Sequence, residues 1–159
     1  MKGKIALTLS LLCFAHSAVT ADLVRVYKAE RKLQILAQGK VVHEFKMVLG
    51  PNPVGHKQQE GDGKTPEGHY LLDFKKPNSS FYKAIHISYP NARDLAAAKK
   101  RGVSAGGQIM MHGQPNGFGL FAAVTQQRDW TAGCIALSNA DMDTLWQAVN
   151  IPTPIEILP

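Results

Sequence analysis

Cysteine is scarce in this chain, and no apolar run is long enough to cross a membrane. The sequence holds two cysteines, Cys13 and Cys134, and Cys13 lies in an N-terminal segment that we expect to be removed. A mature chain with one cysteine has no partner for an intramolecular disulfide. Cys134 is therefore a packed core thiol, an intermolecular partner or a nucleophile. The N-terminal apolar run from Ile5 spans about 11 residues, against the roughly 20 that a bilayer requires.

The first residues have the pattern of an export signal. Lys2 and Lys4 precede the apolar run, and small residues follow it up to Ala21. This order of basic, apolar and small residues predicts a signal peptide over residues 1–21, cleaved after Ala21. Leu12 is bulky where a lipoprotein signal has a small residue, which disfavours lipidation of Cys13. We expect an exported domain over residues 22–159 with no stable membrane insertion after cleavage.

Charge and histidine placement exclude two further classes of protein. Removal of Lys2 and Lys4 lowers the formal net charge from +6 to +4, a modest basic excess. The basic residues are scattered apart from Lys99-Lys100-Arg101, and no aromatic residues alternate with them, so we predict no nucleic-acid partner. His56 and His69 have no cysteine or carboxylate cluster at ligand spacing, so we predict no metal site and no cofactor.

Short segments of alternating or continuous apolar residues, separated by Gly- and Pro-rich loops, predict a mainly β domain. The expected strands are 23–27, 33–36, 41–49, 69–74, 84–89, 108–112 and 155–158. Asn91, with Asp94 three residues later, has the pattern of a capping box that opens one helix, and Ser138 begins a second helix that ends before Pro152. We expect a β-sandwich or distorted barrel with two peripheral helices.

Cys134 and His112 are the residues best suited to chemistry. Gly133 lets the backbone approach closely just before Cys134, and His112 ends a predicted strand that runs into Gly113. A thiol is only a few per cent thiolate at neutral pH, so a nucleophilic cysteine needs a base, and His112 is the best-placed candidate. Spacing alone leaves a packed thiol and a structural histidine as open alternatives.

Three ordered motifs carry a family resemblance. His112-Gly113, the later Thr131-x-Gly133-Cys134 and the earlier Thr65-Pro66-Glu67-Gly68 resemble the signature of the L,D-transpeptidase catalytic domain, the YkuD type, over about Leu23 to Pro159. The resemblance implies the same mainly β fold, a periplasmic location and peptidoglycan stem peptides as substrate. It assigns Cys134 as nucleophile, His112 as base, the Gly113 carbonyl as orienter of the imidazole and N–H groups around Gly133 and Cys134 as an oxyanion hole.

The chain departs from the family pattern at two positions. Ala132 stands where a second histidine is common, and Ala136 stands where many members have an arginine. The change at position 136 removes the usual contact to a substrate carboxylate, for which Arg128 is a candidate replacement; a solvated ion pair of Arg128 with Asp129 is the alternative.

Two further residues are candidates for substrate contact. Thr131 matches the small hydroxyl position of the motif. His86 is expected near the substrate groove, with a purely structural histidine as the alternative. The 20 residues between Gly113 and Cys134 are long enough for a short apolar element and a mobile flap over the cleft.

The resemblance implies acyl transfer through a thioester on Cys134, with an amine acceptor that completes a cross-link. Water as acceptor would make the same site a thiol hydrolase, either an L,D-carboxypeptidase or an amidase that releases a wall-linked lipoprotein. A third reading is a murein-binding module whose cysteine is structural. The sequence leaves the acceptor, the stem-peptide preference and the oligomeric state open.

Overall fold

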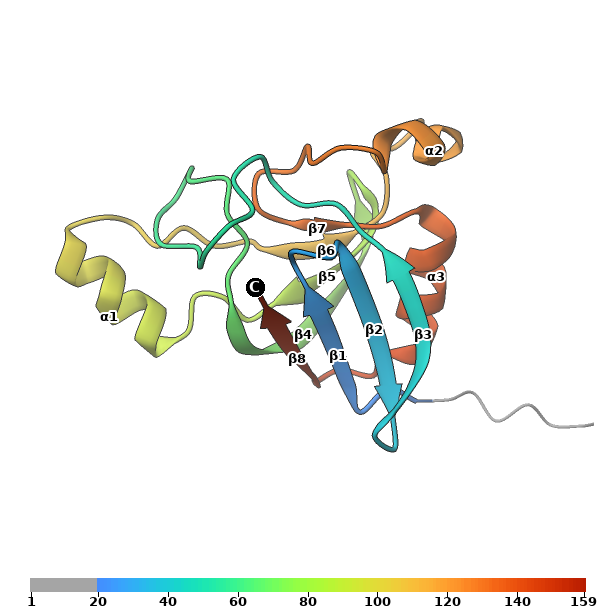
Figure 1. Ribbon diagram of the computed structural model, residues 1–159, viewed down its shortest axis with the longest axis horizontal. Helices are drawn as coiled ribbons and strands as arrows, with labels where there is room; N and C mark the ends of the chain where they lie inside the picture. Colours follow the sequence, from blue (N-terminus) through green and yellow to red (C-terminus); the bar gives the residue numbers. More distant parts are fainter. Residues whose placement is uncertain (1–19) are drawn as a thin grey trace, which may run out of the picture.

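The computed structural model describes residues 20–159 as one curled eight-stranded sheet with helices outside it (Figure 1). The strand order is β3-β2-β1-β8-β4-β5-β6-β7. The bounds are β1 (Leu23–Tyr27), β2 (Lys32–Ala37), β3 (Lys40–Lys46), β4 (Gly68–Ser79), β5 (Tyr82–Ile87), β6 (Met110–His112), β7 (Ile135–Ala136) and β8 (Thr153–Leu158). The predicted mainly β class is confirmed.

The N-terminal strands follow their alternation closely. Alternate residues of β1 are buried, and Gln38 and Gly39 both have positive φ, 52° and 72°, as the two central residues of a tight β2–β3 hairpin require. The strand expected over residues 41–49 ends earlier, at Lys46, because the chain then leaves β2. Val48 instead bridges Ala136 of β7 through two hydrogen bonds of 3.0 and 2.9 Å.

That bridge joins the two edges of the sheet. β3 is the first strand in the order and β7 the last, so a contact between Val48 and Ala136 curls the sheet into a distorted barrel around one core. The interior side chains are mostly aliphatic and fully enclosed; the largest include Leu33, Ile35, Met47, Leu49, Leu72, Ile85, Ile87, Met111, Ile135, Leu137 and Met142. Burial of this apolar surface is the main stabilising term.

The two expected helices are present. α1 (Ala92–Arg101) begins at Asn91 with a complete capping box to Asp94 and ends at Gly102 in the left-handed conformation, and it projects from one end of the molecule (Figure 1). α3 (Asn139–Ala148) begins at Ser138 and packs against β5. A four-residue helix, α2 (Ala122–Thr125), follows the 3-10 turn η1 (Gly119–Phe121).

Most of the predicted signal peptide lies outside the described residues. Of its predicted span, Ala21 is buried and donates its main-chain N–H to the carbonyl of Ala148, 2.8 Å away. Among residues 20–159, no helix has the length and apolar character needed to span a bilayer.

Candidate active site

The sheet register brings His112 and Cys134 to one pocket. In the paired strands Lys76 of β4 lies opposite Ala84 of β5, and Ala84 lies opposite His112 of β6. Cys134 immediately precedes β7, which runs parallel to β6. Directly paired residues share one face of a sheet. The resulting cavity has a volume of about 520 Å³. Its lining residues are Lys76, Ser79, Ser80, Phe81, Ala84, Gln108, Met110, His112, Trp130, Thr131, Ala132 and Cys134.

The imidazole of His112 is held in one tautomer. Its Nδ1 lies 2.7 Å from the carbonyl oxygen of Gly113. Because a carbonyl only accepts, Nδ1 carries the proton and donates it, which leaves the lone pair on Nε2. The rings of Phe81 and Trp130 lie 4.7 and 5.7 Å from the imidazole. Burial lowers the pKa of His112, although the bond to Gly113 opposes that shift, so the imidazole is neutral at neutral pH.

Gly113 has no room for a side chain. A Cβ there would lie 2.6 Å from Oδ1 of Asn139 and 3.0 Å from Cβ of Tyr82. Its own N–H donates to the carbonyls of Phe81 and Lys83, at 3.1 and 3.2 Å. The carbonyl that orients His112 is therefore fixed by the β4–β5 hairpin on one side and by the start of α3 on the other.

The thiol of Cys134 is half-buried and protonated at neutral pH. Its Sγ accepts from the N–H of Met110 at 3.4 Å and lies 3.7 Å from the carbonyl of Gln108. Burial raises the pKa of Cys134, and the Met110 N–H and the charge of Lys57 offset this only in part. With His112 neutral, the resting site holds a thiol and an imidazole and not an ion pair.

The turn before Cys134 depends on Gly133. Gly133 has φ +122°, and a Cβ would lie 2.5 Å from the carbonyl oxygen of Lys64. The hydroxyl of Thr65 donates to the carbonyl of Gly133 at 2.8 Å. The Thr65-Pro66 segment, one of the three ordered motifs, thus directly contacts the loop that carries Cys134.

Lys28 supports Thr65 from below the loop. Lys28 is 2% exposed, and its ammonium group donates to the carbonyls of Gly55 and Thr65 and to the carboxylate of Glu67, at 2.7, 3.1 and 2.8 Å. All three protons are therefore used, as a buried ammonium requires. A chain of contacts thus runs from Lys28 through Thr65 to Gly133.

The two N–H groups of the loop differ. The N–H of Gly133 donates to the hydroxyl of Thr131 at 3.2 Å. The carbonyl of Gly133 points at the hydroxyl of Thr65. The peptide bond from Gly133 to Cys134 is trans, so the N–H of Cys134 points in the direction opposite to that carbonyl. Among residues 20–159 no acceptor is found for the N–H of Cys134. Of the two, only the Cys134 N–H is available to a ligand.

The three predicted substrate contacts have different surroundings. Thr131 lines the pocket, but its hydroxyl also donates to the carbonyl of Cys134 at 2.7 Å, so it braces the loop. His86 lies outside the pocket lining, opposite Met110; it is 2.7 Å from Asp73 and stacks on Phe74. Arg128 is exposed and lies outside the pocket lining. The structure thus brings Thr131 to the pocket and leaves His86 and Arg128 outside it.

Asp129 is bonded to other residues than its neighbour Arg128. Its carboxylate pairs with Arg31 at 2.6 Å and accepts from the N–H of Leu49 at 2.9 Å, and the pKa of Asp129 is lowered, since these bonds outweigh its burial. Asp129 therefore pairs with Arg31, and the alternative expectation of an ion pair between Arg128 and Asp129 is wrong.

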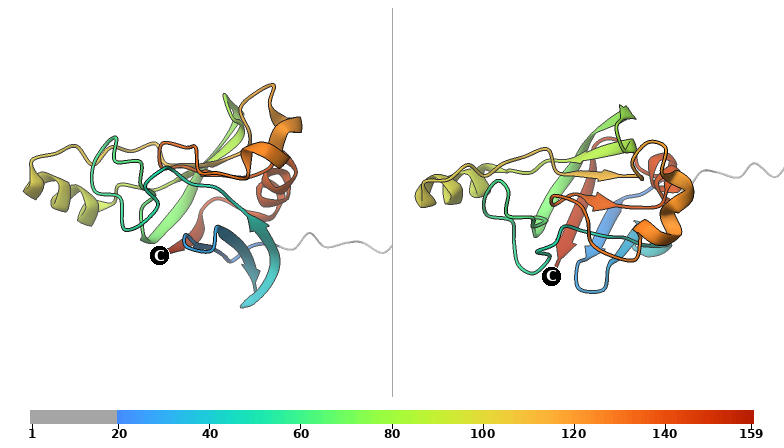
Figure 2. Two further views of the ribbon diagram at one scale, coloured as in Figure 1. Left: turned by 45° about the horizontal axis from the view of Figure 1, so that its top comes forward. Right: turned by 90° about the horizontal axis from the view of Figure 1, so that it is seen from above.

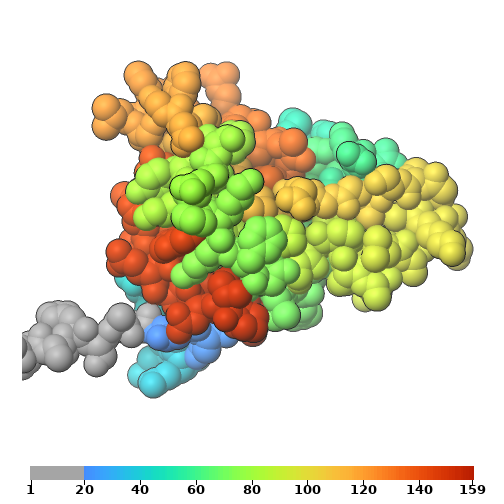
Figure 3. Space-filling model, turned by 180° about the vertical axis from the view of Figure 1, so that it is seen from behind, coloured from blue at the N-terminus to red at the C-terminus, as the bar shows by residue number. Residues whose placement is uncertain are grey.

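The segment between His112 and Cys134 does not cover the pocket along its whole length. Gly117, Gly119 and Leu120 line a separate hollow with the start of α3. Asn116 ties the base of the segment to the β4–β5 hairpin through bonds to Ser79 and Ser80, and the two form neighbouring projections (Figure 2, Figure 3). Only the end of the segment, from Trp130, reaches the pocket.

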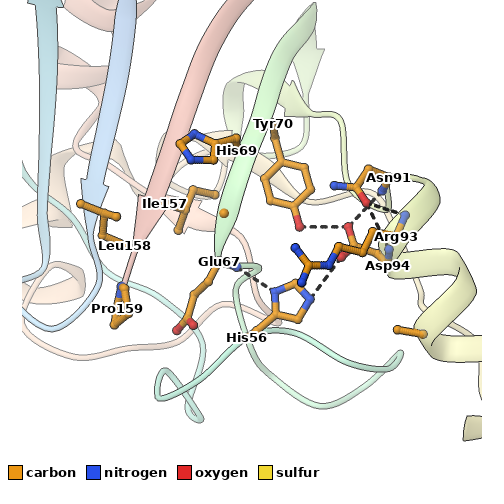
Figure 4. Close-up of a pocket in the computed structure, with 12 residues that line it drawn as sticks. His56, Glu67, His69, Tyr70, Asn91, Arg93, Asp94, Ile157, Leu158 and Pro159 are labelled. Atoms are coloured by element: carbon orange, nitrogen blue, oxygen red, sulfur yellow. Dashed lines mark hydrogen bonds and ion pairs between the residues drawn. The ribbon is translucent and has the colours of Figure 1, made fainter.

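A second, larger hollow of about 670 Å³ lies beside α1 and contains His56 and His69 (Figure 4). Nδ1 of His56 accepts from the N–H of Glu67 at 3.0 Å, and Nε2 lies 3.2 Å from Asp94. Asp94 also accepts from the hydroxyl of Tyr70 at 2.9 Å. Both nitrogens of His56 are therefore used within the fold. Among residues 20–159, no group of three or more His, Cys, Asp or Glu is arranged to hold a metal ion.

Comparison with known proteins agrees with this geometry. The model of the L,D-transpeptidase catalytic domain family, YkuD, matches residues 21–157. The chain belongs to this family. The Escherichia coli K12 protein named "Putative L,D-transpeptidase YafK" is 33% identical over 133 residues, which cover 80% of this chain and 46% of that protein. This L,D-transpeptidase domain thus spans about half the length of the curated relatives it matches.

Solved structures show the same relationship. A variant of the helical cell shape determining protein Pgp2 from Campylobacter jejuni is 29% identical, with a TM-score of 0.66 over 87% of this chain and 47% of its own. Bd1075 from Bdellovibrio bacteriovorus is 27% identical, with a TM-score of 0.61 over 94% of this chain and 52% of its own. An L,D-transpeptidase from Mycobacterium smegmatis, 15% identical, shares the fold.

Several residues of the pocket and its support were not expected from the sequence, among them Phe81, Lys76 and Lys28. Phe81 and Lys76 reach the pocket through the β4–β5 register, for which the local sequence holds no signal. In the sequence, Lys28 is an ordinary lysine that follows a strand. Its burial and its bond to the carbonyl of Thr65 are visible only in the structure.

Proposed function

We propose that this domain is an exported, cysteine-dependent acyltransferase that acts on peptidoglycan stem peptides in the periplasm. The observation that carries the proposal is the pocket in which Cys134 and His112 lie together, with the Cys134 N–H unpaired within the described residues. Family membership supports the reaction class. The roles of Cys134 as nucleophile, His112 as base, Gly113 as orienter and the Cys134 N–H as oxyanion donor are part of the proposal.

The first half-reaction forms a thioester. Sγ of Cys134 attacks the carbonyl carbon at the L-centre of the diamino residue, and the thiol proton passes to Nε2 of His112. The carbonyl oxygen becomes an oxyanion that accepts from the N–H of Cys134. The C–N bond then breaks, and the terminal D-alanine leaves as an amine that takes the proton from His112.

The protonation states of Cys134 and His112 before the reaction suit these chemical steps. A neutral imidazole with its lone pair on Nε2 is the form that accepts a proton. The hydrogen bond from Nδ1 to the carbonyl of Gly113 stabilises the imidazolium as it forms. The thiol must leave its contact with the carbonyl of Gln108 to transfer its proton. Active-site hydrogen bonds of this kind often tighten only when the substrate is bound.

The second half-reaction decides between transferase and hydrolase. An amine acceptor that attacks the thioester releases the thiol and forms a cross-link, whereas water releases a shortened stem peptide. Ala132 and Ala136 are small where the family pattern has histidine and arginine, and Ala132 is exposed at the pocket. The added space favours water access, so hydrolysis, including release of a wall-linked lipoprotein, is the second candidate.

The test is mass spectrometry of the purified protein after incubation with a disaccharide-tetrapeptide, beside Cys134→Ala and Cys134→Ser variants. We expect an adduct on the intact protein equal to the substrate less D-alanine, absent from both variants. A dimer that has lost one D-alanine identifies a transpeptidase, and a monomeric tripeptide identifies a hydrolase.

Binding without turnover in all three proteins would contradict the proposed function and favour a murein-binding module. The Cys134→Ser variant serves as the matched control, because a hydroxyl keeps the size of the side chain and loses its nucleophilicity. Circular dichroism would show that both variants retain the fold.

A further inference from the structure

We propose that Lys76 binds a carboxylate of the donor stem peptide and so replaces the arginine that the family pattern has at position 136. The inference rests on the proposed function, since it names the substrate group that the same pocket recognises. It starts from the pocket lining, in which Lys76 is the only charged residue apart from the titratable His112 and Cys134.

Lys76 has no carboxylate partner within the described residues. Several other lysines of this domain pair with a carboxylate: Lys28 with Glu67, Lys57 with Asp62 and Lys83 with Asp143. Lys76 takes part in none of the ion pairs or side-chain hydrogen bonds found among residues 20–159, and no Asp or Glu lines the pocket. The pocket therefore carries a positive charge that a substrate anion can neutralise.

The register fixes where that charge lies. Lys76, Ala84, His112 and Ala136 form one row across β4, β5, β6 and β7. Ala84 between Lys76 and His112 is small, so it leaves open space in the row. The Cα atoms of Lys76 and His112 are two strand spacings apart, roughly 10 Å, and the four-carbon stem of lysine is flexible. The ammonium group can thus approach a group bound next to His112.

The row has Ala136, a departure from the family pattern, at its β7 end and Lys76 at its β4 end. Ala136 at the β7 end is fully buried, with a methyl group where many members have a guanidinium. Arg128, the replacement expected from the sequence, and Lys76 are both exposed, but Arg128 lies outside the pocket lining. Lys76 at the β4 end is the cation that the fold does place in the pocket.

The ligand chemistry follows from the substrate. The carboxylate of the terminal D-alanine is separated from the scissile carbonyl carbon only by the nitrogen and Cα of that residue, and a diamino residue with a second carboxyl offers another anion nearby. Either is a carboxylate that an ammonium can pair with. Phe81, Met110 and Trp130 line the same pocket, and Lys76 itself is exposed to solvent, where a substrate anion can reach it.

The test measures binding and turnover separately. In a Cys134→Ala background, calorimetry gives the affinity for the tetrapeptide, for its terminal carboxamide and for the carboxamide of the diamino side chain, with Lys76 present or changed to Met. We expect Lys76→Met to weaken the tetrapeptide about tenfold, as for the loss of one charged contact. One of the two carboxamides lacks the carboxylate that Lys76 binds. The affinity for that carboxamide should be the same with and without the Lys76→Met change, and this result identifies which carboxylate Lys76 recognises.

Two controls sharpen the result. Lys76→Arg keeps the charge and should restore most of the affinity. Lys40→Met removes the same charge from an exposed site in the remote β2–β3 hairpin and should change nothing. Equal weakening of all three ligands by Lys76→Met, no weakening at all, or the absence of binding would overturn the inference.

Turnover by the protein with Cys134 intact tests the proposed function independently. Carboxylate binding that depends on Lys76, without an acyl adduct on Cys134, would leave the inference standing and remove the acyltransferase proposal. With turnover, Lys76→Met should raise KM about tenfold and change kcat little, since the contact exists before the chemistry begins.

Discussion

The two histidine-containing pockets differ in how completely their polar groups are paired. Beside α1, His56, Asp94 and the hydroxyl of Tyr70 bond to one another or to main-chain groups (Figure 4). In the Cys134 pocket, the N–H of Cys134 and the ammonium of Lys76 have no partner within residues 20–159, and the same holds for the buried indole N–H of Trp130.

The pairing of polar groups distinguishes a structural pocket from a candidate ligand site better than the volume of the pocket does. The α1 hollow is larger and is lined by two histidines against one, yet the bonds of His56, Asp94 and Tyr70 are made within the fold. Burial and the neighbouring Asp94 carboxylate raise the pKa of Tyr70, so its hydroxyl stays a donor. An unpaired buried group such as the indole N–H of Trp130 costs folding free energy, whereas the ammonium of Lys76 is exposed to solvent and is free to meet a ligand. The predictions below test that contrast.

The largest effect is expected for Gly133→Ala. The new Cβ would lie 2.5 Å from the carbonyl of Lys64, and Gly133 has φ +122°, so the loop must shift and carry the Cys134 N–H with it. A misplacement of about 1 Å costs on the order of 100-fold in rate. Acyl-adduct formation in stopped-flow or quenched mass spectrometry measures it.

Gly39→Ala is the matched control for that loop. Gly39 also has a positive φ, +72°, but nothing lies within 4 Å of a Cβ placed there. It should cost about 1 kcal/mol of stability and leave adduct formation unchanged. An equal loss of rate in both variants would mean that Gly133 matters only for folding.

Asp94→Ala should have its effect on stability alone. The carboxylate accepts from Tyr70, from the N–H of Asn91 and from His56, and its removal leaves these donors unpaired. We expect a loss of about 2–4 kcal/mol in the free energy of unfolding by urea, with kcat/KM unchanged at a temperature where the variant is folded. A loss of kcat/KM would show that the α1 pocket takes part in function.

The smallest effect is a change in pH dependence for Phe81→Ala. The base form of His112 is neutral, and burial holds its pKa below the ordinary value of 6.5, so activity should fall as pH drops through that lowered pKa. Loss of the Phe81 ring, 4.7 Å from the imidazole, admits water and raises the pKa toward its ordinary value.

The acid limb of the kcat/KM profile should therefore move to higher pH in Phe81→Ala. Titration of the His112 ring by NMR would follow the same change without substrate. An unmoved limb would show that Phe81 does not control the environment of the base.

Much of the fold was predictable because its signals are local. The alternation in β1, the Gln38-Gly39 turn, the capping box at Asn91 and the cap at Ser138 each depend on residues within one element. The motifs around His112 and Cys134 are also local. The family assignment followed from them and was confirmed by the match over residues 21–157.

The surroundings of the candidate site were not predictable in this way. The end of β3 at Lys46 depends on a bridge from Val48 to Ala136, across 88 positions of chain. The placement of Arg128 outside the pocket and of Asp129 against Arg31 depends on the path of a loop. Such contacts join residues far apart in the chain, so no local sequence pattern predicts them.

The sequence by itself predicted most of the strands, the helix starts and one thiol and one histidine as candidates for a shared site, because propensity, caps and short motifs act over a few residues. Only the tertiary structure decided that Thr65 holds Gly133, that Phe81 covers His112 and that Lys76 lies in the pocket. These depend on strand register and loop packing, which bring together residues far apart in the chain.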